Sequence, residues 1–428
     1  MTDNRRLLFI APSAYPLGGV ATWIDYLLPG LEEQGWEPTL GLAAGKYHDA
    51  GRYLAEHPFH RVRCIYNPTG SQEGRVRALC DAVLQVDPAV VLSVNISDTY
   101  LAMARLRSSG RSKAKAVMTL HGIQTDLLAD AHTFRYVLDA VICTNRLTCE
   151  LVYERAAVAP GRVHYAPYGV EIVPVDLSNR KTNADRLRIA WVGRLEEEQK
   201  QVSDIPRILQ LLDQRGIAFE LWVVGTGPDE GRLRQQLAPW LGDGRAQIWG
   251  ALPREQVYRD IYRNADIFLL TSSWETGPIV LWEAMSFSLP AVTSDYLGAG
   301  PEGSLVDQKN CLMYPVGDIE CAVDCIARFQ DPNLRSDLGA QALSLVSERY
   351  TTGASIAAWS GVLNDICASD LKKIESPEMR LPPRGRLDHW LGVRTGETLR
   401  RTVGLRFEHQ DAGGEWPHTN SGVRLNGI

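Results

Sequence analysis

Residues 265–285 of the chain read ADIFLLTSSWETGPIVLWEAM. The stretch begins with an apolar run, which predicts a buried strand. Gly277-Pro278 then opens a helix, since proline is tolerated in a first helical turn. Glu275 precedes the helix start, and Glu283 projects from the helix itself. A buried strand that turns directly into a helix is the repeating unit of an α/β sheet, so this stretch predicts a doubly wound fold.

The turn between that strand and helix suits a ligand that carries both a phosphate and sugar hydroxyls. Backbone N–H groups and the positive end of the helix dipole favour an anion at a helix start. A carboxylate cannot itself bind phosphate, so Glu275 and Glu283 should face hydroxyls. The alternative is a Glu275 that caps the helix and a Glu283 that is solvated or ion-paired.

Length and composition limit the classes of protein that the chain can be. Its 428 residues, 45% hydrophobic and 22% charged, are enough for two domains and an appendage. A net charge of −6 gives no global reason to expect a nucleic-acid partner. No apolar run reaches membrane-spanning length, and the first ten residues are too polar for a signal peptide, so we expect a cytoplasmic protein.

Short apolar runs alternate with longer amphipathic segments, which predicts parallel sheets covered by helices. In the first half we expect strands at residues 7–12, 90–95, 116–120, 140–144 and 163–166. In the second half we expect them at 188–192, 219–224, 247–249, 267–271 and 291–293. The predicted fold class is therefore α/β, with two doubly wound Rossmann-like domains that face an interdomain cleft.

Loops at other strand ends carry residues that a phosphate-bearing ligand needs. Gly18-Gly19 separates the first strand from a helix, where glycine lets the backbone approach a ligand, although such a turn is also a common structural device. Arg194 and Lys200 follow the first strand of the second half and together suit a diphosphate; in the alternative, Lys200 pairs with the acidic run 196–198. His121 ends an apolar strand, either as a hydrogen-bonded structural residue or facing the cleft.

The ordered set of these motifs resembles one family. The set comprises Gly18-Gly19, His121-Gly122, residues 167–171 (PYGVE), Gly193-Arg194 with Lys200, residues 225–228 (GTGP), and Glu275 with Glu283. In this order, over about residues 5–365, it resembles a family 4 retaining glycosyltransferase of the GT-B fold, in the glycosyl transferases group 1. The resemblance implies a sugar transfer from a nucleotide-diphosphate sugar to a hydroxyl acceptor in glycan, polysaccharide or glycoconjugate biosynthesis.

The resemblance also implies a role for each site residue. Glu283 would hold the ribose hydroxyls, and Glu275 would contact hydroxyls of the donor sugar, with His121 lying against that sugar. Arg194 and Lys200 would neutralise the diphosphate leaving group. Its cradle would be completed by the Gly18-Gly19 loop and the backbone N–H groups of Gly277, Ile279 and Val280. The catalytic set is then Glu275, His121, Arg194 and Lys200.

The domain boundaries follow from the strand pattern and the resemblance together. We expect an N-terminal acceptor-binding domain at 1–171, a polar linker at 172–186 and a C-terminal nucleotide-sugar-binding domain at 187–350. A helix at 351–368 would pack back on the N-terminal domain. The sequence departs from the family where Thr276-Gly277-Pro278 follows Glu275, and this leaves the selectivity for the donor sugar open.

The expected partners are a UDP- or GDP-sugar donor and an acceptor that is a saccharide, a lipid-linked sugar, a protein or a small molecule. We expect no cofactor and no tightly bound metal, because no Asp-x-Asp motif follows the cleft strands. Two alternatives stay open: another GT-B enzyme, such as a nucleotide-sugar epimerase or a sugar phosphorylase, and a non-catalytic nucleotide-sugar-binding protein. Product analysis separates the first from a transferase, and binding without turnover identifies the second.

The tail at 369–428 lies outside the resemblance and contains several prolines and arginines. Leu387, Trp390, Leu391 and Arg394 have helical spacing, which fits a basic amphipathic helix on a membrane surface or a helix packed on the protein itself. A disordered tail is the third alternative. The basic run 105–115 either attracts anionic lipid or is the solvated end of a helix before a strand. The sequence thus allows a peripheral contact at the inner face of a membrane.

Overall fold

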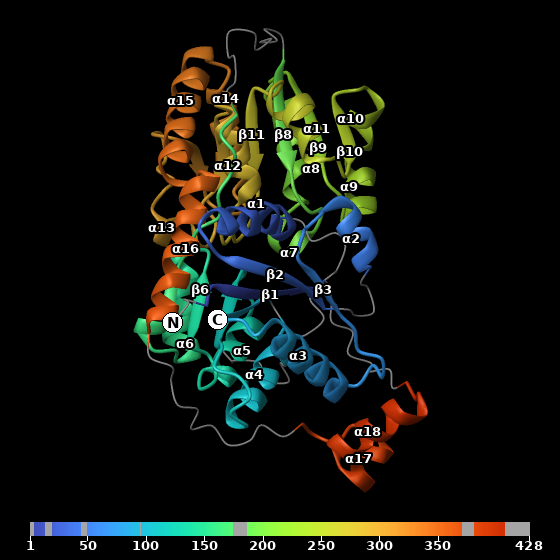
Figure 1. Ribbon diagram of the computed structural model, residues 1–428. Coiled ribbons are helices and arrows are strands. Elements are labelled where there is room, and N and C mark those ends of the chain that lie inside the picture. The colour runs from blue at the N-terminus through green and yellow to red at the C-terminus, as the bar shows by residue number, and fades with distance from the viewer. Residues whose placement is uncertain are drawn as a thin grey trace. The chain divides into compact units, whose positions relative to one another are not determined.

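The computed structural model describes residues 4–12, 19–43, 49–94, 96–173, 186–369 and 381–406. The chain divides into two compact units, each with its own parallel sheet (Figure 1). Unit 1 combines Met1–Ala166 with Ile356–Ile428, and unit 2 is Pro167–Ser355. The expected linker at 172–186 falls mostly on residues 174–185, which lie outside the described residues.

The sheet of unit 1 has seven parallel strands in the order β3-β2-β1-β4-β5-β6-β7. The strands are β1 (Arg6–Pro12), β2 (Glu37–Ala43), β3 (Val62–Ile65), β4 (Val90–Val94), β5 (Lys115–Leu120), β6 (Ala140–Cys143) and β7 (Val163–Tyr165). Every residue of the central strands β4 and β5 is buried. Helices cover both faces of such a sheet, which is why these strands read as continuous apolar runs.

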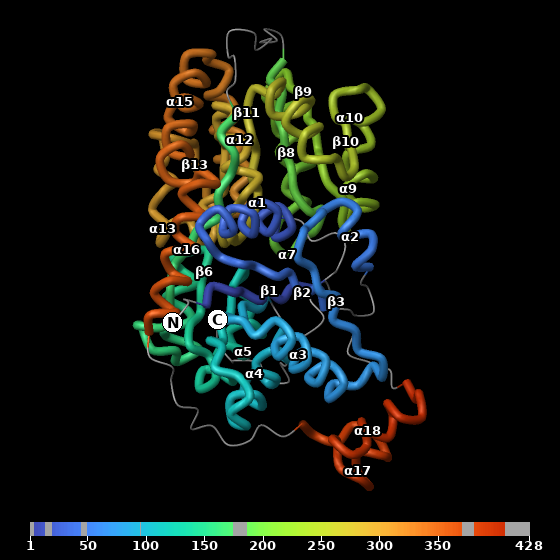
Figure 2. The backbone as a smooth tube through the Cα atoms, viewed as in Figure 1, coloured from blue at the N-terminus to red at the C-terminus, as the bar shows by residue number. Residues whose placement is uncertain are grey.

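The helices of unit 1 connect these strands (Figure 2). Those between residues 72 and 156 pack apolar side chains into one core with the sheet. The connecting helices are α1 (Gly19–Glu33), α2 (Ala50–Glu56), α3 (Gln72–Val86), α4 (Asp98–Ser108), α5 (Thr125–Phe134), α6 (Arg146–Ala156) and the short 3₁₀ turn η1 (Pro160–Arg162). α16 (Thr352–Ala368) returns to unit 1, where Trp359 packs on Trp23 with ring centroids 4.8 Å apart. Trp36 Nε1 also donates to Ser360 Oγ at 3.3 Å.

The sheet of unit 2 has six parallel strands in the order β10-β9-β8-β11-β12-β13. The strands are β8 (Leu187–Val192), β9 (Phe219–Val224), β10 (Ala246–Gly250), β11 (Ile267–Leu270), β12 (Ala291–Ser294) and β13 (Leu312–Tyr314). In chain order this is the 3-2-1-4-5-6 arrangement of a doubly wound sheet, which the first six strands of unit 1 share. The predicted α/β class with two doubly wound domains is confirmed.

The helices of unit 2 include a pair on one side of the sheet, α8 with α14, and a pair formed by α12 with α15. The full set is α7 (Glu197–Lys200), α8 (Asp204–Gln214), α9 (Glu230–Gln236), α10 (Ala238–Gly242), α11 (Arg254–Gln256), the π-helix η3 (Val257–Tyr262), α12 (Ile279–Ser286), α13 (Ala299–Glu302), α14 (Ile319–Arg328) and α15 (Pro332–Arg349). α8 alternates apolar and polar residues with helical period, so one face enters the core and the other meets solvent.

Three strands were not expected from the sequence: β2, β3 and β13. β2 reads EPTLGLA, so a proline and a glycine interrupt its apolar pattern. A Cβ on Gly41 would lie 3.1 Å from Ile65 Cδ1 and 3.3 Å from Leu8 Cδ1, so both side chains would have to move slightly to admit it. β3 is an edge strand with one buried residue, and β13 is only three residues long. Neither carries the apolar run that identifies a central strand.

Part of the tail folds onto unit 1 as two short helices, α17 (Arg386–Leu391) and α18 (Val393–Val403), beside α3 (Figure 1). Between residues 386 and 403 the tail is therefore helical and packed on the protein itself, as one of the three alternatives proposed. Residues 370–380 and 407–428 lie outside the described residues.

Candidate functional site

The strand order of unit 2 reverses between β8 and β11. In open α/β sheets, ligands bind outside the carboxyl ends of the strands at such a reversal. β8 leads there into Gly193-Arg194, and β11 leads into the segment from Thr271 to Glu275. The stretch that predicted the fold thus ends at the position where its topology places a ligand.

Lys200 and Glu275 form a buried ion pair at this point. Lys200 Nζ lies 2.5 Å from Glu275 Oε1, and both side chains are buried. The same oxygen accepts from Ser272 Oγ at 2.6 Å, while the other carboxylate oxygen accepts from Gln199 Nε2 at 3.1 Å. Thr271 Oγ1 donates to the carbonyl oxygen of Lys200 at 2.6 Å. The loop after β11 therefore holds both the backbone and the ammonium group of Lys200.

Two glycines allow the loop after β9 to pack against the loop after β8. Gly225 has a φ of +134°, and a Cβ on it would lie 1.8 Å from the carbonyl oxygen of Gly193. A Cβ on Gly227 would lie 2.2 Å from the carbonyl oxygen of Leu195. These close approaches require glycine. Residues 225–228 are thus a tight connection that supports the loop carrying Arg194.

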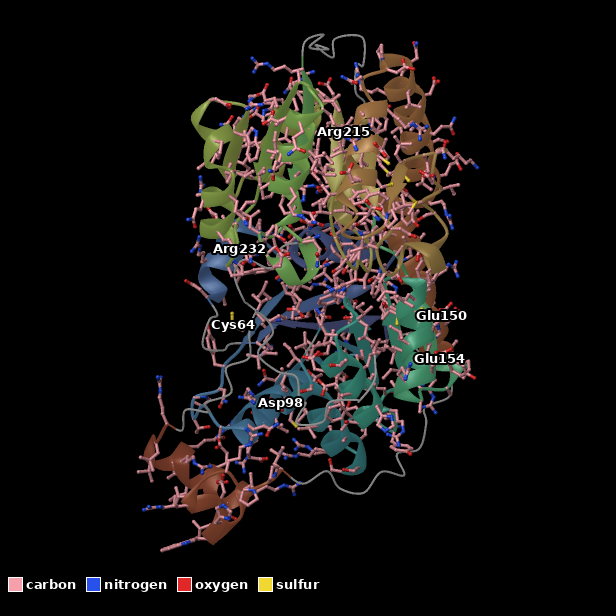
Figure 3. All side chains as sticks on the ribbon, turned by 180° about the vertical axis from the view of Figure 1, so that it is seen from behind. Cys64, Asp98, Glu150, Glu154, Arg215 and Arg232 are labelled. Carbon is pink, nitrogen blue, oxygen red and sulfur yellow. The ribbon has the colours of Figure 1, made fainter. Side chains whose placement is uncertain are left out.

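Two residues of the acidic run 196–198 pair with arginines at the surface. Arg194 Nη2 lies 2.6 Å from Glu196 Oε1 and the arginine is 41% exposed. Glu197 Oε2 lies 2.9 Å from Nη2 of Arg232, which is labelled in Figure 3. The alternative in which Lys200 pairs with the acidic run is wrong, because Lys200 pairs with Glu275.

Glu283 is the centre of a second buried cluster. Its Oε1 atom accepts from Arg254 Nε at 3.1 Å and from the Tyr258 hydroxyl at 3.0 Å. The Tyr262 hydroxyl donates to Oε2 at 3.4 Å. Burial raises the pKa of Glu283 above its ordinary value, and the positive charge of Arg254 opposes that shift. Glu283 is therefore ion-paired, as one of the two alternatives proposed.

Arg254 still has a donor to offer a ligand. Its Nη2 atom is buried and has no hydrogen-bond partner among the described residues. Tyr258 lies on the π-helix η3. π-helices are rare in proteins overall, and those that occur are often at functional sites. The sequence interpretation did not single out Arg254, Tyr258 or Tyr262. A signal was present, because Arg254 and Tyr258 are one helical turn apart just after Pro253.

The helix start between the two glutamates has the expected backbone but a different cap. α12 begins at Ile279, and Pro278 is its N-cap rather than a residue of the first turn. No side chain caps this helix, so the alternative of a capping Glu275 is wrong. Gly277 has a φ of +116°, which side chains rarely adopt. The N–H groups of Ile279 and Val280 belong to the first turn, where a helix has no internal acceptor for them.

Three of the predicted site residues, Gly18, Gly19 and His121, lie in unit 1. His121 follows β5, and its Nε2 atom lies 2.9 Å from Thr119 Oγ1. The imidazole packs on Trp23 with ring centroids 4.6 Å apart, and burial lowers the pKa of His121 to about 3. Gly19 is the first residue of α1, and Gly18 lies outside the described residues.

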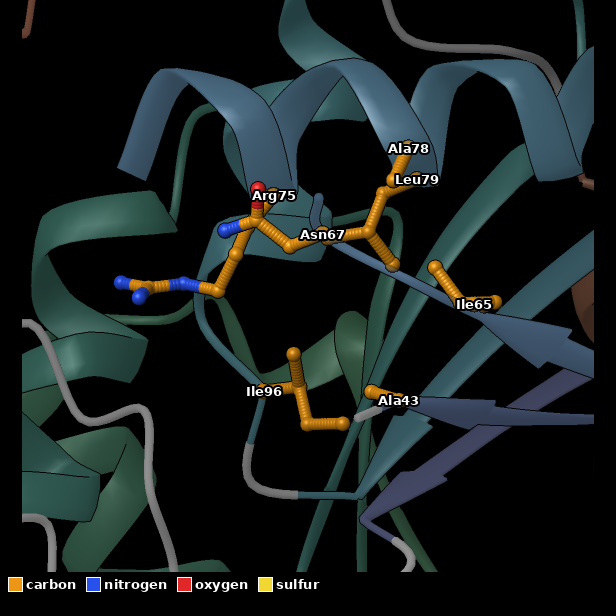
Figure 4. A pocket seen from close by; sticks show the side chains of 7 residues that line it. All are labelled: Ala43, Ile65, Asn67, Arg75, Ala78, Leu79 and Ile96. Carbon is orange, nitrogen blue, oxygen red and sulfur yellow. The ribbon is translucent and has the colours of Figure 1, made fainter. Parts of the chain in front are cut away.

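Unit 1 also has a small pocket at the carboxyl ends of β2, β3 and β4 (Figure 4). Its wall is apolar at Ala43, Ile65 and Ile96, and polar at Asn67 and Arg75. Arg75 Nε lies 2.6 Å from Oδ2 of the buried Asp98, at the start of α4. The pocket therefore combines an apolar wall with a fixed cation.

Metal-ligand clusters and membrane-spanning helices can be assessed for the part of the chain that the structure describes. Neither a cluster of three or more His, Cys, Asp or Glu residues suited to a metal ion, nor a helix long and apolar enough to cross a membrane, is present in that part.

Comparisons with known proteins agree with this geometry. The model of the glycosyl transferases group 1 matches residues 186–331, and that of Glycosyltransferase Family 4 matches residues 17–173. A curated relative, the amylovoran biosynthesis glycosyltransferase AmsK of Erwinia amylovora, is 31% identical over 53% of this chain and 57% of its own length. The lipopolysaccharide 1,6-galactosyltransferase of Salmonella typhimurium is 30% identical over 55% of this chain and 64% of its own length. The chain thus aligns with somewhat less than two thirds of the length of each of these relatives.

Solved structures share the fold at low sequence identity. The lipopolysaccharide outer core galactosyltransferase WaaB, in its apo form, has a TM-score of 0.66 at 18% identity and covers 84% of this chain and 99% of its own. Anabaena HepE, solved in complex with UDP and glucose, has a TM-score of 0.69 at 16% identity and covers 84% of this chain and 100% of its own. Both units have matching family models, and the fold is GT-B. The chain belongs to the family 4 glycosyltransferases of the glycosyl transferases group 1.

Proposed function

We propose that this protein transfers a sugar from a nucleotide-diphosphate sugar to a hydroxyl group of a saccharide or lipid-linked saccharide, with retention of anomeric configuration. The observation that carries the proposal is the pair of buried clusters in unit 2. Lys200 with Glu275 lies at the strand reversal, and Glu283, on the helix that follows, pairs with Arg254 of α11. Their charges match the two ends of a nucleotide sugar, an anionic diphosphate and a set of hydroxyls.

The ribose end of the donor is assigned to the Glu283 cluster. A buried carboxylate accepts hydrogen bonds from two neighbouring hydroxyls, and Arg254 Nη2 donates to an oxygen of the nucleoside. Tyr258 and Tyr262 hold the carboxylate from its other sides. The cluster is therefore oriented before the donor binds, which lowers the entropy cost of binding.

The diphosphate and the transferred sugar are assigned to the strand reversal. Lys200, Arg194 and the N–H groups of Gly277, Ile279 and Val280 stabilise the charge that develops on the leaving phosphate. Glu275 accepts from the sugar hydroxyls and orients Lys200. The acceptor oxygen bonds to the anomeric carbon as the bond to the diphosphate oxygen breaks, on the same face, and the acceptor proton passes to the departing phosphate. No resident cofactor or metal is part of this proposal.

The acceptor is assigned to unit 1. His121, neutral above about pH 3, is the residue of this unit that we place against the donor sugar. The relatives named in polysaccharide and lipopolysaccharide biosynthesis support a saccharide acceptor. We further propose that the protein works in the cytoplasm, in peripheral contact with the inner face of a membrane.

A ligand screen tests the donor assignment. Thermal unfolding is measured with UDP-, GDP- and ADP-sugars, because a ligand at about 100 times its dissociation constant adds about 2.7 kcal/mol of stability. One nucleotide series should raise the melting temperature, and the rise should be lost in Glu283→Ala. No shift with any nucleotide would remove the main support for the proposal. Product analysis with the active donor then separates transfer from epimerisation, and binding without turnover would identify a non-catalytic binder.

A further inference from the structure

We propose that the hairpin of α17 and α18 is a docking surface for an anionic lipid bilayer. The proposal names the surface for the peripheral contact proposed above, and in that respect it rests on the proposed function. It does not depend on the donor chemistry. The matched family models end at residue 331, so neither of them covers this hairpin.

The hairpin is held in a fixed shape on unit 1 by a buried carboxylate. Glu397 on α18 is fully buried and accepts from Thr69 Oγ1 at 2.7 Å and from Ser71 Oγ. Ser71 caps the N-terminus of α3, so the negative charge lies near the positive end of that helix. A Cβ on Gly74 would lie 2.8 Å from Glu397 Oε1, so the glycine makes room for the carboxylate.

A second buried pair ties the two short helices together. Arg400 Nη2 on α18 lies 2.6 Å from Oδ1 of Asp388 on α17, and both side chains are buried. Arg77 on α3 donates to the Arg394 carbonyl oxygen at 2.6 Å and to Thr398 Oγ1 at 3.0 Å. These contacts show that α17 and α18 form one body that packs on α3.

The same packing leaves apolar side chains in solvent. Eleven large hydrophobic residues are exposed among the described residues, and five of them lie between positions 390 and 405. Trp390 is 86% exposed and Val403 is 61% exposed; the others are Leu391, Leu399 and Leu405. Leu399 and Val403 are one turn apart on α18, so they share a face. A soluble surface rarely concentrates apolar side chains in this way without a partner.

The charge of the exposed surface has one sign. Asp388 and Glu397 are the acidic residues between positions 381 and 406, and both are buried. Arg386, Arg394 and Arg406 are exposed around the apolar residues. The protein as a whole carries a net charge of −6, so this basic surface is a local exception. Tryptophan and arginine together suit the headgroup level of a bilayer with anionic lipids.

The other basic run of the sequence is used inside the fold. Arg105 binds both oxygens of the buried Glu73, at 3.0 Å and 2.8 Å. Arg107 binds both oxygens of Asp139, at 3.0 Å and 3.1 Å, and both of these side chains are buried. Lys115 Nζ donates to the Ser369 carbonyl oxygen at 2.6 Å. Three of the five basic residues of the run therefore stabilise unit 1, while Arg111 and Lys113 are exposed. The run 105–115 has no exposed large apolar residue, so the hairpin is the surface that fits a membrane.

Co-sedimentation of the full chain with vesicles tests the proposal. The protein should bind phosphatidylcholine vesicles that contain about 30% phosphatidylglycerol, and should not bind phosphatidylcholine alone. Trp390→Ser with Leu391→Ser should weaken binding about tenfold or more, since the variant loses apolar side chains that the bilayer would bury. Arg386→Ser and Arg406→Ser should each weaken it about fivefold. Raising the salt to about 0.5 M should also weaken binding of the original chain.

The matched control is Tyr153→Ser with Arg155→Ser on α6, which removes an exposed aromatic ring and an exposed arginine elsewhere in unit 1. Its vesicle binding should be unchanged, and thermal unfolding should show that all variants are folded. Equal binding to both vesicle types, no binding at all, or an equal loss in the control would overturn the proposal. So would a Trp390→Ser chain that loses self-association in sedimentation velocity without lipid, because the surface would then join two copies.

Transfer to a soluble saccharide acceptor is measured in parallel. The hairpin variants should retain it, because no hairpin residue belongs to the donor site. If the chain binds vesicles through the hairpin but transfers no sugar, the proposed function fails and the docking surface stands. If it transfers sugar but ignores lipid, the reverse holds.

Discussion

Replacing Lys200 by methionine should destabilise unit 2 as well as stop transfer. The ammonium group lies 2.5 Å from Glu275 Oε1, and both partners are buried. Removing one partner of a buried ion pair costs about 3–5 kcal/mol, because the other charge stays buried without compensation. Ser272 Oγ and Gln199 Nε2 continue to donate to Glu275, so we expect the lower end, about 3 kcal/mol.

Differential scanning calorimetry of the full chain measures this loss. Unit 2 spans Pro167–Ser355, and for a domain of that size 1 kcal/mol shifts the melting temperature by about 2–4 °C. The transition of unit 2 in Lys200→Met should therefore move down by about 6–12 °C. The transition of unit 1 should stay in place, because Lys200 contributes nothing to its core.

Removing both charges separates the contribution of the ion pair to stability from the contribution of side-chain packing. In Lys200→Met with Glu275→Gln, no buried charge is left without a partner, so the loss should shrink to about 1 kcal/mol. A single variant within about 0.5 kcal/mol of the original chain, or a double variant as unstable as the sum of both single changes, would refute this reasoning.

Arg194→Ala is the matched test of catalysis without destabilisation. The arginine is 41% exposed, and its pair with Glu196 is a surface pair worth less than about 1 kcal/mol. Unfolding should hardly change, whereas transfer should fall on the order of 100-fold if the guanidinium stabilises the leaving diphosphate. Steady-state kinetics with the donor identified by the thermal screen measure the fall. An unchanged rate would remove Arg194 from the catalytic set.

Three further outcomes are expected. Glu283→Gln should weaken UDP binding at least about tenfold by titration calorimetry. In the original chain, binding should weaken as the pH falls through the raised pKa of Glu283, and the variant should lack this dependence. The pKa of His121 is lowered to about 3, so the unfolded chain gains a proton near pH 6.5 that the folded chain does not. About 1 kcal/mol of stability should therefore be lost between pH 7.5 and 5.5. Urea titrations of His121→Asn should show that this loss is abolished. Gly225→Ala should cost about 3 kcal/mol, because its Cβ would meet the Gly193 carbonyl oxygen, whereas Gly231→Ala, with open space around it, should unfold like the original chain.

The central strands could be predicted from the sequence because both of their faces are buried. β5 (KAVMTL) and β11 (IFLL) are apolar runs with no exposed position, so composition alone identifies them. β3 has a single buried residue and hydrogen-bonds to one neighbour, so its sequence carries little of the signal. Edge strands depend on the sheet that they join, and a local pattern does not contain that information.

The site could be predicted in its parts but not in its pairing. Lys200 and Glu275 were each singled out from the sequence, yet their contact joins positions that are 75 residues apart. Arg254 was not singled out at all, and it meets Glu283 across 29 positions. Spacing along one helix or strand predicts neighbours only within that element. Contacts between loops at a strand reversal are set by the order of strands in the sheet.

Each of the three cations of the proposed donor site lies beside a carboxylate that neutralises it. Glu275 neutralises Lys200, Glu196 neutralises Arg194, and Glu283 neutralises Arg254. A diphosphate therefore meets no excess of positive charge from these three cations and must share them with carboxylates. Two kinds of hydrogen-bond donor can bind a ligand without first leaving another partner. They are Arg254 Nη2 and the first-turn N–H groups of α12. If the proposed assignment holds, the site is already arranged for the nucleoside end of the nucleotide sugar, and binding has to redistribute charge at the diphosphate end.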